Sequence, residues 1–347
     1  MTSLFLHFRW FLVLSLWLMG SVLTQVKAAP TDDTQAVIAA LAKSNQAVVG
    51  VHVRATSGAR SSDGLGQVRS GSGVVIGSDG LILTIGYLIL EAQHIQIMTQ
   101  DDKVYPAQVV AYDLSTGFGL IRSLVPLKGI TPVKFGELKN VEIGEVLMAA
   151  SGTQIDGDEA DVNMTHLVHK RAFTGTWEYH IESAIFTSPP VEKHSGAPLF
   201  NQLGELVGIG SLFVLDAIGP SQPHPGNMFV PVDLLVPILA ELRVSGSSSA
   251  STRPWLGMNT QDNEGKIQVQ RVGKESPAHA AGLRPGDVVL AVDGNQVSTL
   301  ESFYKSLWSR SPPEVEVELT VLQGSEIKTL VVKAVNRLST LRKAEGI

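Results

Sequence analysis

The chain has 347 residues, which is enough for two or three domains that each bury a hydrophobic core. It contains no cysteine, and this excludes disulfide scaffolds, thiol catalysis and thiolate metal sites. Its formal net charge of −6 comes from 27 basic and 33 acidic residues dispersed along the chain, a distribution that argues against nucleic-acid binding.

The first segment predicts export from the cytoplasm. His7 and Arg9 precede an apolar run at residues 10–23, and a small-residue pattern at 26–28 suits cleavage after Ala28. The run is shorter than the ~20 residues that cross a bilayer comfortably. We therefore expect residues 1–28 to be a signal peptide, with an uncleaved membrane anchor as the alternative.

The next part of the chain predicts a helix followed by β structure. Residues 32–43 form an amphipathic pattern, and a strand is expected at 47–53. The segment 55–70 is polar and rich in glycine and serine, so we expect a mobile loop. Two apolar runs around a Ser-Asp-Gly turn predict a hairpin over 74–84.

Short strands continue after this hairpin without a long helix between them. They are expected near residues 95–98, 108–112, 119–121, 146–149, 181–187, 206–209 and 228–230. This spacing is typical of an all-β sandwich or a pair of barrels, and the abundance of glycine and proline fits it. A helix at 234–242 would close the first domain, which we place at 29–244.

The run at 245–252 is rich in serine and glycine and predicts a flexible linker. As a random coil it would place its ends about 15 Å apart, so we expect a hinge between two modules. The second module is placed at 253–336 and the C-terminal tail at 337–347.

The second module predicts a compact β-rich fold with one main helix. Strands are expected at 266–272, 288–292, 315–322 and 329–332. The helix is expected to begin behind Ser298, with Glu301 three residues later completing a capping box. Its apolar face would comprise Leu300, Phe303, Tyr304 and Leu307.

Several motifs occur in one order along the chain. They are the glycine-rich strand 71–76, the serine loop 195–199, the strand end 229–231 and the stretch 255–294. Together they resemble the HtrA/Deg family of periplasmic trypsin-like proteases that carry a PDZ domain, over residues 45–336. The resemblance implies a mainly β fold, with a trypsin-like double six-stranded β-barrel followed by a PDZ domain, in the periplasm or anchored to the inner membrane facing it.

The resemblance also assigns the positions of the catalytic residues. Ser195 occupies the nucleophile position, while Tyr87 stands where the family has histidine. Gly117 stands in place of the aspartate, and Lys193 in place of the oxyanion-loop glycine. One position of the four is therefore retained.

These replacements remove the chemistry that activates a serine. Tyrosine has a pKa of about 10 against about 6.5 for histidine, so holding a phenolate at neutral pH costs about 5 kcal/mol. Gly117 offers no side chain to orient a base, and Lys193 has a Cβ where glycine suits the loop. We expect Ser195 to be a structural relic of the loop, without a catalytic role. The alternative is a rearranged base drawn from His180, Lys193 or His194.

The loop Trp255-Leu256-Gly257-Met258 is the expected peptide-binding element. By resemblance, its backbone N–H groups receive a C-terminal carboxylate, and the next strand edge accepts the peptide as an added strand. Leu256 and Met258 would line the pocket for the last side chain. Ordinary core packing by these apolar residues is the alternative.

No metal or cofactor is expected. His166 and His169 have a spacing that can bind a metal, but without a third ligand we expect exposed loop residues. The acidic stretch 156–161 lacks the ligand spacing of an EF-hand and predicts a solvated loop.

The expected function is binding. The chain is predicted to be an exported HtrA-like pseudoprotease that captures envelope proteins or peptides through its PDZ domain, as an adaptor, scaffold or chaperone-like factor. One alternative is an active serine endopeptidase that uses Ser195 with a non-standard base. Another is a regulatory subunit of an oligomer with active homologues, since members of the family form trimers; a homo-trimer is the simpler assembly.

Overall fold

The computed structural model describes residues 32–220 and 222–342. The predicted signal peptide, 1–28, lies outside the described residues, as does the end of the predicted tail. Within the described ranges, no helix combines the length and apolar character needed to span a membrane.

The first barrel is built from the N-terminal half of the chain. Its strands are β1 (Val48–Ala55), β2 (Val68–Val75), β3 (Leu81–Ile85), β4 (Ala92–Met98), β5 (Val104–Tyr112) and β6 (Phe118–Ser123). They close in the order β1-β2-β3-β6-β5-β4, with antiparallel neighbours. Alternate apolar side chains of these strands fill the interior, as the alternating pattern of burial along β4 shows. The predicted hairpin at 74–84 is confirmed by the pairing of Val74 with Leu83.

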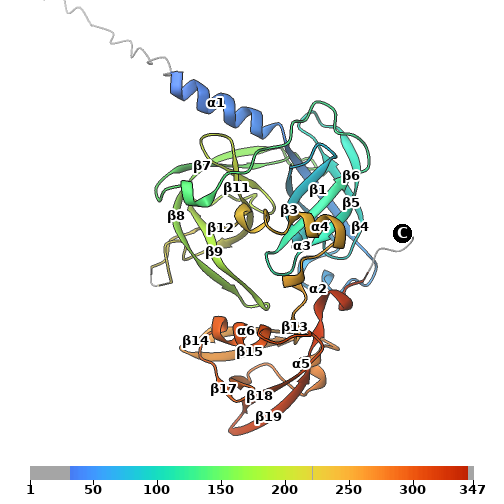
Figure 1. Cartoon of the computed structure of the whole chain (residues 1–347), viewed down its shortest axis with the longest axis vertical. Coiled ribbons are helices and arrows are strands. Elements are labelled where there is room, and N and C mark those ends of the chain that lie inside the picture. Colours follow the sequence, from blue (N-terminus) through green and yellow to red (C-terminus); the bar gives the residue numbers. More distant parts are fainter. Residues whose placement is uncertain (1–31, 221, 343–347) are drawn as a thin grey trace, which may run out of the picture.

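The second barrel follows and repeats this architecture. Its strands are β7 (Val146–Ser151), β8 (Asp161–Gly175), β9 (Tyr179–Ser188), β10 (Pro198–Phe200), β11 (Leu206–Val214) and β12 (Gly226–Pro231). They close in the order β10-β11-β12-β9-β8-β7, which confirms the predicted pair of six-stranded barrels. One hydrophobic cluster contains side chains of both barrels, so they form a single packed unit. In Figure 1 the helix α1 (Asp32–Asn45) leads into the upper end of this unit.

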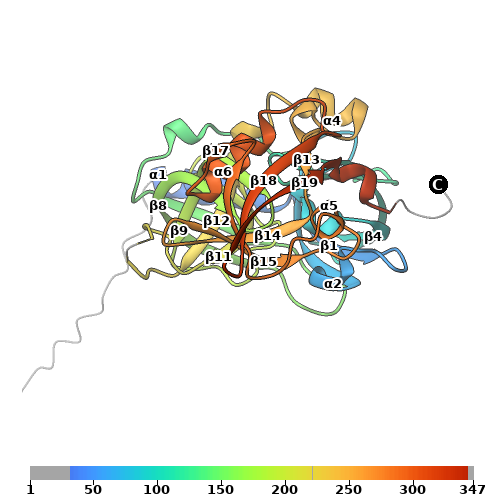
Figure 2. The same cartoon turned by 90° about the horizontal axis from the view of Figure 1, so that it is seen from below.

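The C-terminal domain lies at the other end of the barrels, next to the tip of the β8–β9 hairpin (Figure 1). Its main sheet comprises β14 (Met258–Asn263), β15 (Lys266–Val272), β16 (Val288–Val292), β17 (Asn295–Gln296), β18 (Glu316–Gln323) and β19 (Glu326–Lys333). Its helices are α5 (Pro277–Ala280) and α6 (Leu300–Trp308), and the short strands β13 (Pro254–Trp255) and β20 (Val335–Asn336) pair with each other. Seen from below, the domain covers parts of both barrels (Figure 2).

The helix α6 has the predicted buried face and a different cap. All four predicted apolar residues are buried. The N-cap is Thr299 rather than Ser298, because Thr299 has an extended backbone and its hydroxyl accepts the N–H of Ser302. Ser302 returns the hydrogen bond to the N–H of Thr299, so the capping box does not use Glu301.

Two other predicted segments differ from the structure. The helix expected at 234–242 starts later, as α4 (Leu239–Ser245), behind the 3-10 turn Val232–Leu234. Pro237 explains the delay, because proline has no N–H to donate and fits only at a helix start. The expected loop 55–70 contains the short helix α2 (Ser62–Leu65) and the start of β2.

The expected flexible hinge at 245–252 is wrong. Ser248 and Ser251 are buried, and both hydroxyls donate to the carboxylate of Asp113 in the loop between β5 and β6. The Ser251 hydroxyl also accepts the N–H of Leu114 at 2.8 Å. Serine composition resembles that of a flexible linker, but here the hydroxyls find a buried acceptor and fix the segment.

Asp113 is adapted to this anchoring role. Burial alone would raise the pKa of its carboxyl group, but the hydrogen bonds from Ser248, Ser251, Thr116 and Ser115 together outweigh burial and lower the pKa below 3.8. The carboxylate is therefore charged at neutral pH and holds the linker against the first barrel.

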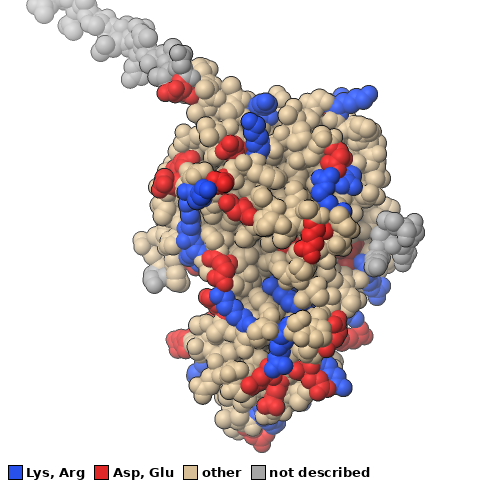
Figure 3. Space-filling model, viewed as in Figure 1, with Lys and Arg blue, Asp and Glu red and all other residues tan. Residues whose placement is uncertain are grey.

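Charged side chains are interspersed on the surface. The face shown in Figure 3 carries acidic and basic groups side by side, over both the barrels and the C-terminal domain. This mixed pattern agrees with the mild net charge of the sequence.

Candidate functional site

The serine loop is held against the first barrel by its backbone. The carbonyl of Ser195 accepts the N–H of Ser72 in β2 at 2.9 Å. Gly196 has a φ of +73°, and a Cβ on it would lie 2.1 Å from the carbonyl oxygen of Ser72. Only glycine fits this close approach without displacing the loop.

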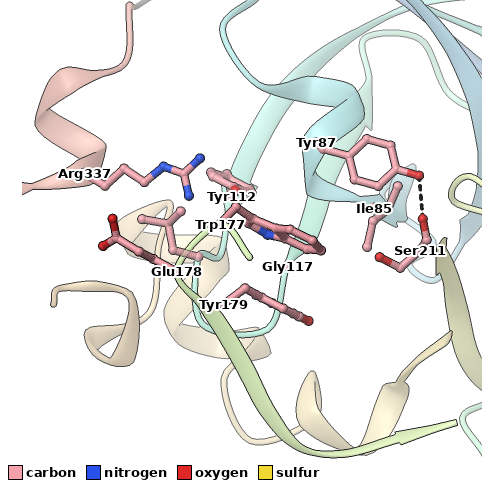
Figure 4. Close-up of a pocket in the computed structure, with 10 residues that line it drawn as sticks. Ile85, Tyr87, Tyr112, Gly117, Trp177, Glu178, Tyr179, Ser211 and Arg337 are labelled. Atoms are coloured by element: carbon pink, nitrogen blue, oxygen red, sulfur yellow. Dashed lines mark hydrogen bonds between the residues drawn. The ribbon is translucent and has the colours of Figure 1, made fainter. Parts of the chain in front are cut away.

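Tyr87 faces Ser195 directly. Its hydroxyl oxygen lies 2.8 Å from Ser195 Oγ and 3.0 Å from the carbonyl oxygen of Ser211. A phenol carries a single hydrogen, so that hydrogen goes to one of these two oxygens. In either case the hydroxyl of Ser195 faces a neutral phenol. Figure 4 shows Tyr87 turned toward Ser211 on the side of the cavity away from Glu178.

The segment that carries Tyr87 is fixed by a buried arginine. Tyr87 belongs to the short helix α3 (Gly86–Ile89) between β3 and β4. The guanidinium of Arg69 donates to the carbonyl of Tyr87 at 3.0 Å and to that of Leu90 at 2.8 Å. These two bonds hold the tyrosine in front of the serine loop.

The environment of Tyr87 keeps it protonated. Burial raises the pKa of its phenol to about 12, and the hydrogen bond with Ser195 opposes this only in part. At neutral pH the group has no basic form to offer to a serine hydroxyl.

Gly117 lines the same cavity, whose volume is about 50 Å³, and its carbonyl accepts the N–H of Gly86, the residue before Tyr87, at 2.7 Å. It has a φ of +82°, and a Cβ there would lie 3.3 Å from the hydroxyl oxygen of Tyr179. That hydroxyl donates to the carbonyl of Thr116 at 2.6 Å. A tyrosine, and not a carboxylate, therefore fills the space next to Gly117 (Figure 4).

Lys193 points away from Ser195. Its ammonium donates to the carbonyl of Glu159 at 2.9 Å and lies 3.9 Å from the carboxylate of Asp158. Lys193 does not have a positive φ. The loop thus has a conformation that a residue with a Cβ adopts without strain at this position.

The other two candidate bases have different partners. His180 Nδ1 lies 2.8 Å from Thr174 Oγ1, and His194 Nδ1 lies 3.0 Å from the carbonyl oxygen of Glu192. Within the described part of the chain, neither imidazole hydrogen-bonds to Ser195.

The expected peptide-binding loop holds a carboxylate from the chain itself. The side chain of Glu178 accepts the backbone N–H groups of Leu256 at 3.1 Å, Gly257 at 2.8 Å and Met258 at 3.3 Å. Glu178 is buried and belongs to the turn between β8 and β9. The loop therefore presents three converging donors to one carboxylate.

The same turn also contacts the edge of β14 and α6. The carbonyl of Thr176 accepts the N–H of Thr260 at 2.9 Å. The N–H of Glu178 donates to the hydroxyl of Tyr304 at 3.2 Å, and that hydroxyl lies 2.9 Å from Thr260 Oγ1. Residues 176–178 thus lie between the edge strand and the main helix of the C-terminal domain.

Comparisons with known proteins agree with both domains. Residues 71–209 match the family model of a trypsin-like peptidase domain, and residues 254–334 match that of a PDZ domain. The chain belongs to the HtrA/Deg family. A probable periplasmic serine endoprotease DegP-like from Halomonas elongata is 27% identical over 276 residues, which are 76% of this chain and 55% of the relative. A relative of the same name from Pseudomonas putida (strain W619) is 28% identical over 65% of this chain and 48% of its own length.

Solved HtrA structures share the fold. The HtrA-type protease AlgW with tripeptide gives a TM-score of 0.53 at 20% identity and covers 88% of this chain and 97% of its own. A serine endoprotease from Yersinia pestis gives a TM-score of 0.53 at 22% identity, over 89% and 99% of the two chains. The present chain spans about half the length of the curated relatives it matches.

One functional residue of this HtrA/Deg chain was missed by sequence reasoning. Glu178 stands between Trp177 and Tyr179, whose rings stack 5.7 Å apart. In a sequence, an acidic residue between two aromatic residues is only a weak indication of a buried carboxylate that contacts another domain. Its partners are about 80 residues away in the sequence.

The histidine pair was also placed incorrectly. Residues 164–169 belong to β8 and do not form a loop. His166 is exposed on that strand and His169 is half-buried. The alternation of apolar and polar residues that begins at Val162 and Met164 breaks at residues 166–169, so neither face of the strand stays apolar and the strand pattern is weak.

A cluster of possible metal ligands lies where β9 meets α6. It consists of His180, Glu182 and Glu301, whose ligand atoms lie within 4.8 Å of one another. The ammonium of Lys305 lies 2.7 Å from each of the two carboxylates. One lysine therefore already pairs with both carboxylates of this cluster.

Proposed function

We propose that this HtrA/Deg protein is a pseudoprotease that acts by binding polypeptides through its PDZ domain. The observation that carries the proposal is the contact between Tyr87 and Ser195 Oγ. A serine nucleophile needs an acceptor for its proton near neutral pH, and histidine supplies this in active relatives of the fold. The acceptor here is a phenol whose pKa is raised by burial to about 12.

The magnitude argues against a phenolate base. Ionising a group with a pKa of about 12 at pH 7 costs about 7 kcal/mol. This free energy is similar in size to the increase in activation free energy when catalytic residues of a triad are removed. Gly117 adds no carboxylate, and the contacts of His180 and His194 lie elsewhere.

Binding is supported by the PDZ domain. Three backbone N–H groups converge at residues 256–258, which is the arrangement that recognises a carboxylate at a strand edge. The AlgW protein that shares the fold is described with a tripeptide and with a decapeptide. The proposed ligands are C-termini or extended segments of envelope proteins, in keeping with the periplasmic names of the relatives.

The test compares the purified mature chain with its Ser195→Ala variant on an unfolded protein such as casein. We expect equal and negligible hydrolysis by both, and no labelling of Ser195 by a fluorophosphonate. Hydrolysis that disappears in Ser195→Ala would contradict the proposal and assign a working serine endopeptidase. Tyr87→Phe is a useful companion, because it removes the phenol and leaves the serine loop in place.

A further inference from the structure

The loop 255–258, the edge strand β14 and the helix α6 together form what we call the PDZ groove. The turn between β8 and β9 places two groups in this groove. The Thr176 carbonyl bonds to the N–H of Thr260 on the edge strand β14, as a residue of an added strand would. The Glu178 carboxylate occupies the three donors of the loop before that strand. Both contacts come from the protease-like domain.

These contacts correspond to the two parts of C-terminal recognition. A bound C-terminus supplies main-chain groups to the strand edge and a carboxylate to the loop. Residues 176–178 supply the same two groups, with the carboxylate on a side chain. We infer that the β8–β9 turn is an internal ligand of the PDZ groove, and that an external polypeptide C-terminus binds there only by displacing Glu178. The inference rests on the proposed function, because it concerns the groove assigned there to C-termini.

The conformation of Glu178 indicates that it is held in place by its partners. Its φ is +58°, in the left-handed region that residues with a Cβ adopt at a cost. Its carboxylate is also buried, which is unfavourable without compensating donors. The three N–H groups supply this compensation, and the guanidinium of Arg337 lies on the same side of the cavity (Figure 4).

An internal ligand reduces the apparent affinity for an external one. The observed dissociation constant equals the intrinsic constant divided by the fraction of molecules with an open groove. Removing the Glu178 carboxylate raises that fraction. The Thr176–Thr260 bond must also open when a peptide adds to β14. The backbone contacts of Glu178 with Tyr304 and Arg253 do not involve the carboxylate, so they remain in the Glu178 variants and keep the domains packed.

The experiment measures binding of a fluorescent decapeptide that ends in an apolar residue with a free carboxylate. The full mature chain is compared with Glu178→Ala and with Glu178→Gly, a second variant that suits the positive φ. Glu182→Ala is the matched control, because it removes an interdomain ion pair with Lys305 and leaves the loop occupied. The same peptide with an amidated C-terminus tests whether the carboxylate is read.

We expect both Glu178 variants to bind the free-carboxylate peptide at least about tenfold more tightly than the unsubstituted chain. Glu182→Ala should change affinity by less than about twofold, and the amidated peptide should gain little in any variant. Equal affinity in the unsubstituted chain and both Glu178 variants would overturn the inference while leaving PDZ binding intact. A gain in Glu182→Ala as large as that in Glu178→Ala would also overturn it, because domain packing would then explain both.

Hydrogen exchange separates this inference from the proposed function. The amides of residues 256–258 should exchange faster in Glu178→Ala than in the unsubstituted chain, with no peptide present. Faster exchange without peptide binding by any variant would support the internal ligand and contradict the proposed peptide-binding function. Unchanged exchange would overturn the internal ligand.

Discussion

At the scale of single residues, the candidate site places a tyrosine hydroxyl, and not an imidazole, against the hydroxyl of Ser195. The hydroxyl of Tyr87 contacts Ser195, and Tyr179 occupies the space beside Gly117. Two tyrosines thus stand where a histidine and an aspartate would work together. Under the proposed function, the hydrogen bonds at the site position the chain and do not transfer a proton at neutral pH.

The raised pKa of Tyr87 predicts a pH dependence of stability. Because the folded pKa of about 12 lies above the ordinary value of 10, the contribution is complete below pH 10 and is lost as the pH rises through 12. We expect the unsubstituted chain to lose about 2 kcal/mol more unfolding free energy than Tyr87→Phe between pH 9 and 12. Urea unfolding of both proteins across this range is the measurement. The other tyrosines are common to both, and identical pH profiles would show that Tyr87 titrates normally.

Restoring the aspartate position should damage the fold before it helps catalysis. Gly117→Asp introduces a side chain at positive φ and places its Cβ against Tyr179, so we expect a loss of about 2 kcal/mol. Gly129 has nearly the same φ, +83°, with nothing within 4 Å of its Cβ position. Gly129→Asp is therefore the matched control, and thermal unfolding compares the two. A loss in Gly117→Asp no larger than that in Gly129→Asp would show that Tyr179 does not crowd the site.

At the scale of elements, the linker illustrates what sequence patterns can predict. The barrel strands with alternating apolar residues and the buried face of α6 follow from local periodicity, and they were predicted. The linker was not, because a serine-rich run carries no sign of its acceptor. Asp113 lies 135 residues before Ser248, and only the fold brings them together.

A local pattern also fails where an element is stabilised mainly by its neighbours. The strand β8 has few continuous apolar positions, so its residues His166 and His169 were expected in a loop. The strand is stabilised by its pairing with both β7 and β9. For the same reason Glu178, in the turn after β8, could not be connected with residues 256–258. The resemblance to the family was enough to single out Tyr87 and Gly117. The contact of Tyr87 with Ser195, and that of Gly117 with Tyr179, became visible only in the structure.

The anchored linker should be sensitive to one of its serines. Ser251→Ala removes a donor to Asp113 and leaves the N–H of Leu114 without its hydroxyl acceptor, so we expect a loss of about 2 kcal/mol. Ser249→Ala, at an exposed neighbouring position, should change stability by less than about 0.5 kcal/mol. Urea unfolding gives both values, and proteolytic cleavage within 245–252 should increase only in Ser251→Ala. Equal behaviour of the two variants would show that the linker is not anchored through Ser251.

At the scale of the whole molecule, the two domains are joined through buried polar contacts. Arg253 donates to the carbonyl of Leu114 at 3.1 Å and lies 3.5 Å from the ring centre of Trp308. Burial lowers the pKa of this guanidinium to about 10, and the charges of Glu178 and Asp113 oppose the decrease. Arg253 therefore remains charged at neutral pH and connects the PDZ domain with the first barrel.

Removal of this arginine should uncouple the domains. We expect Arg253→Ala to unfold in two thermal transitions instead of one and to have a larger radius of gyration in X-ray scattering, since an interdomain hydrogen bond and a cation–π contact are lost. Arg271→Ala, an exposed change within the PDZ sheet, is the control and should behave as the unsubstituted chain. A single transition and an unchanged radius in Arg253→Ala would mean that other contacts hold the domains together.

The anchoring of Ser248 and Ser251 shortens the tether between the domains. With those hydroxyls bound to Asp113, the free chain before the PDZ sheet is reduced to a few residues, so the PDZ domain cannot diffuse far from the β8–β9 turn. An intramolecular partner on a short tether is present at an effective concentration on the order of millimolar or more. A dilute polypeptide cannot compete with a partner at that concentration unless its intrinsic affinity is high. If the groove binds chain ends as proposed, the protein responds only where such ends reach a high local concentration.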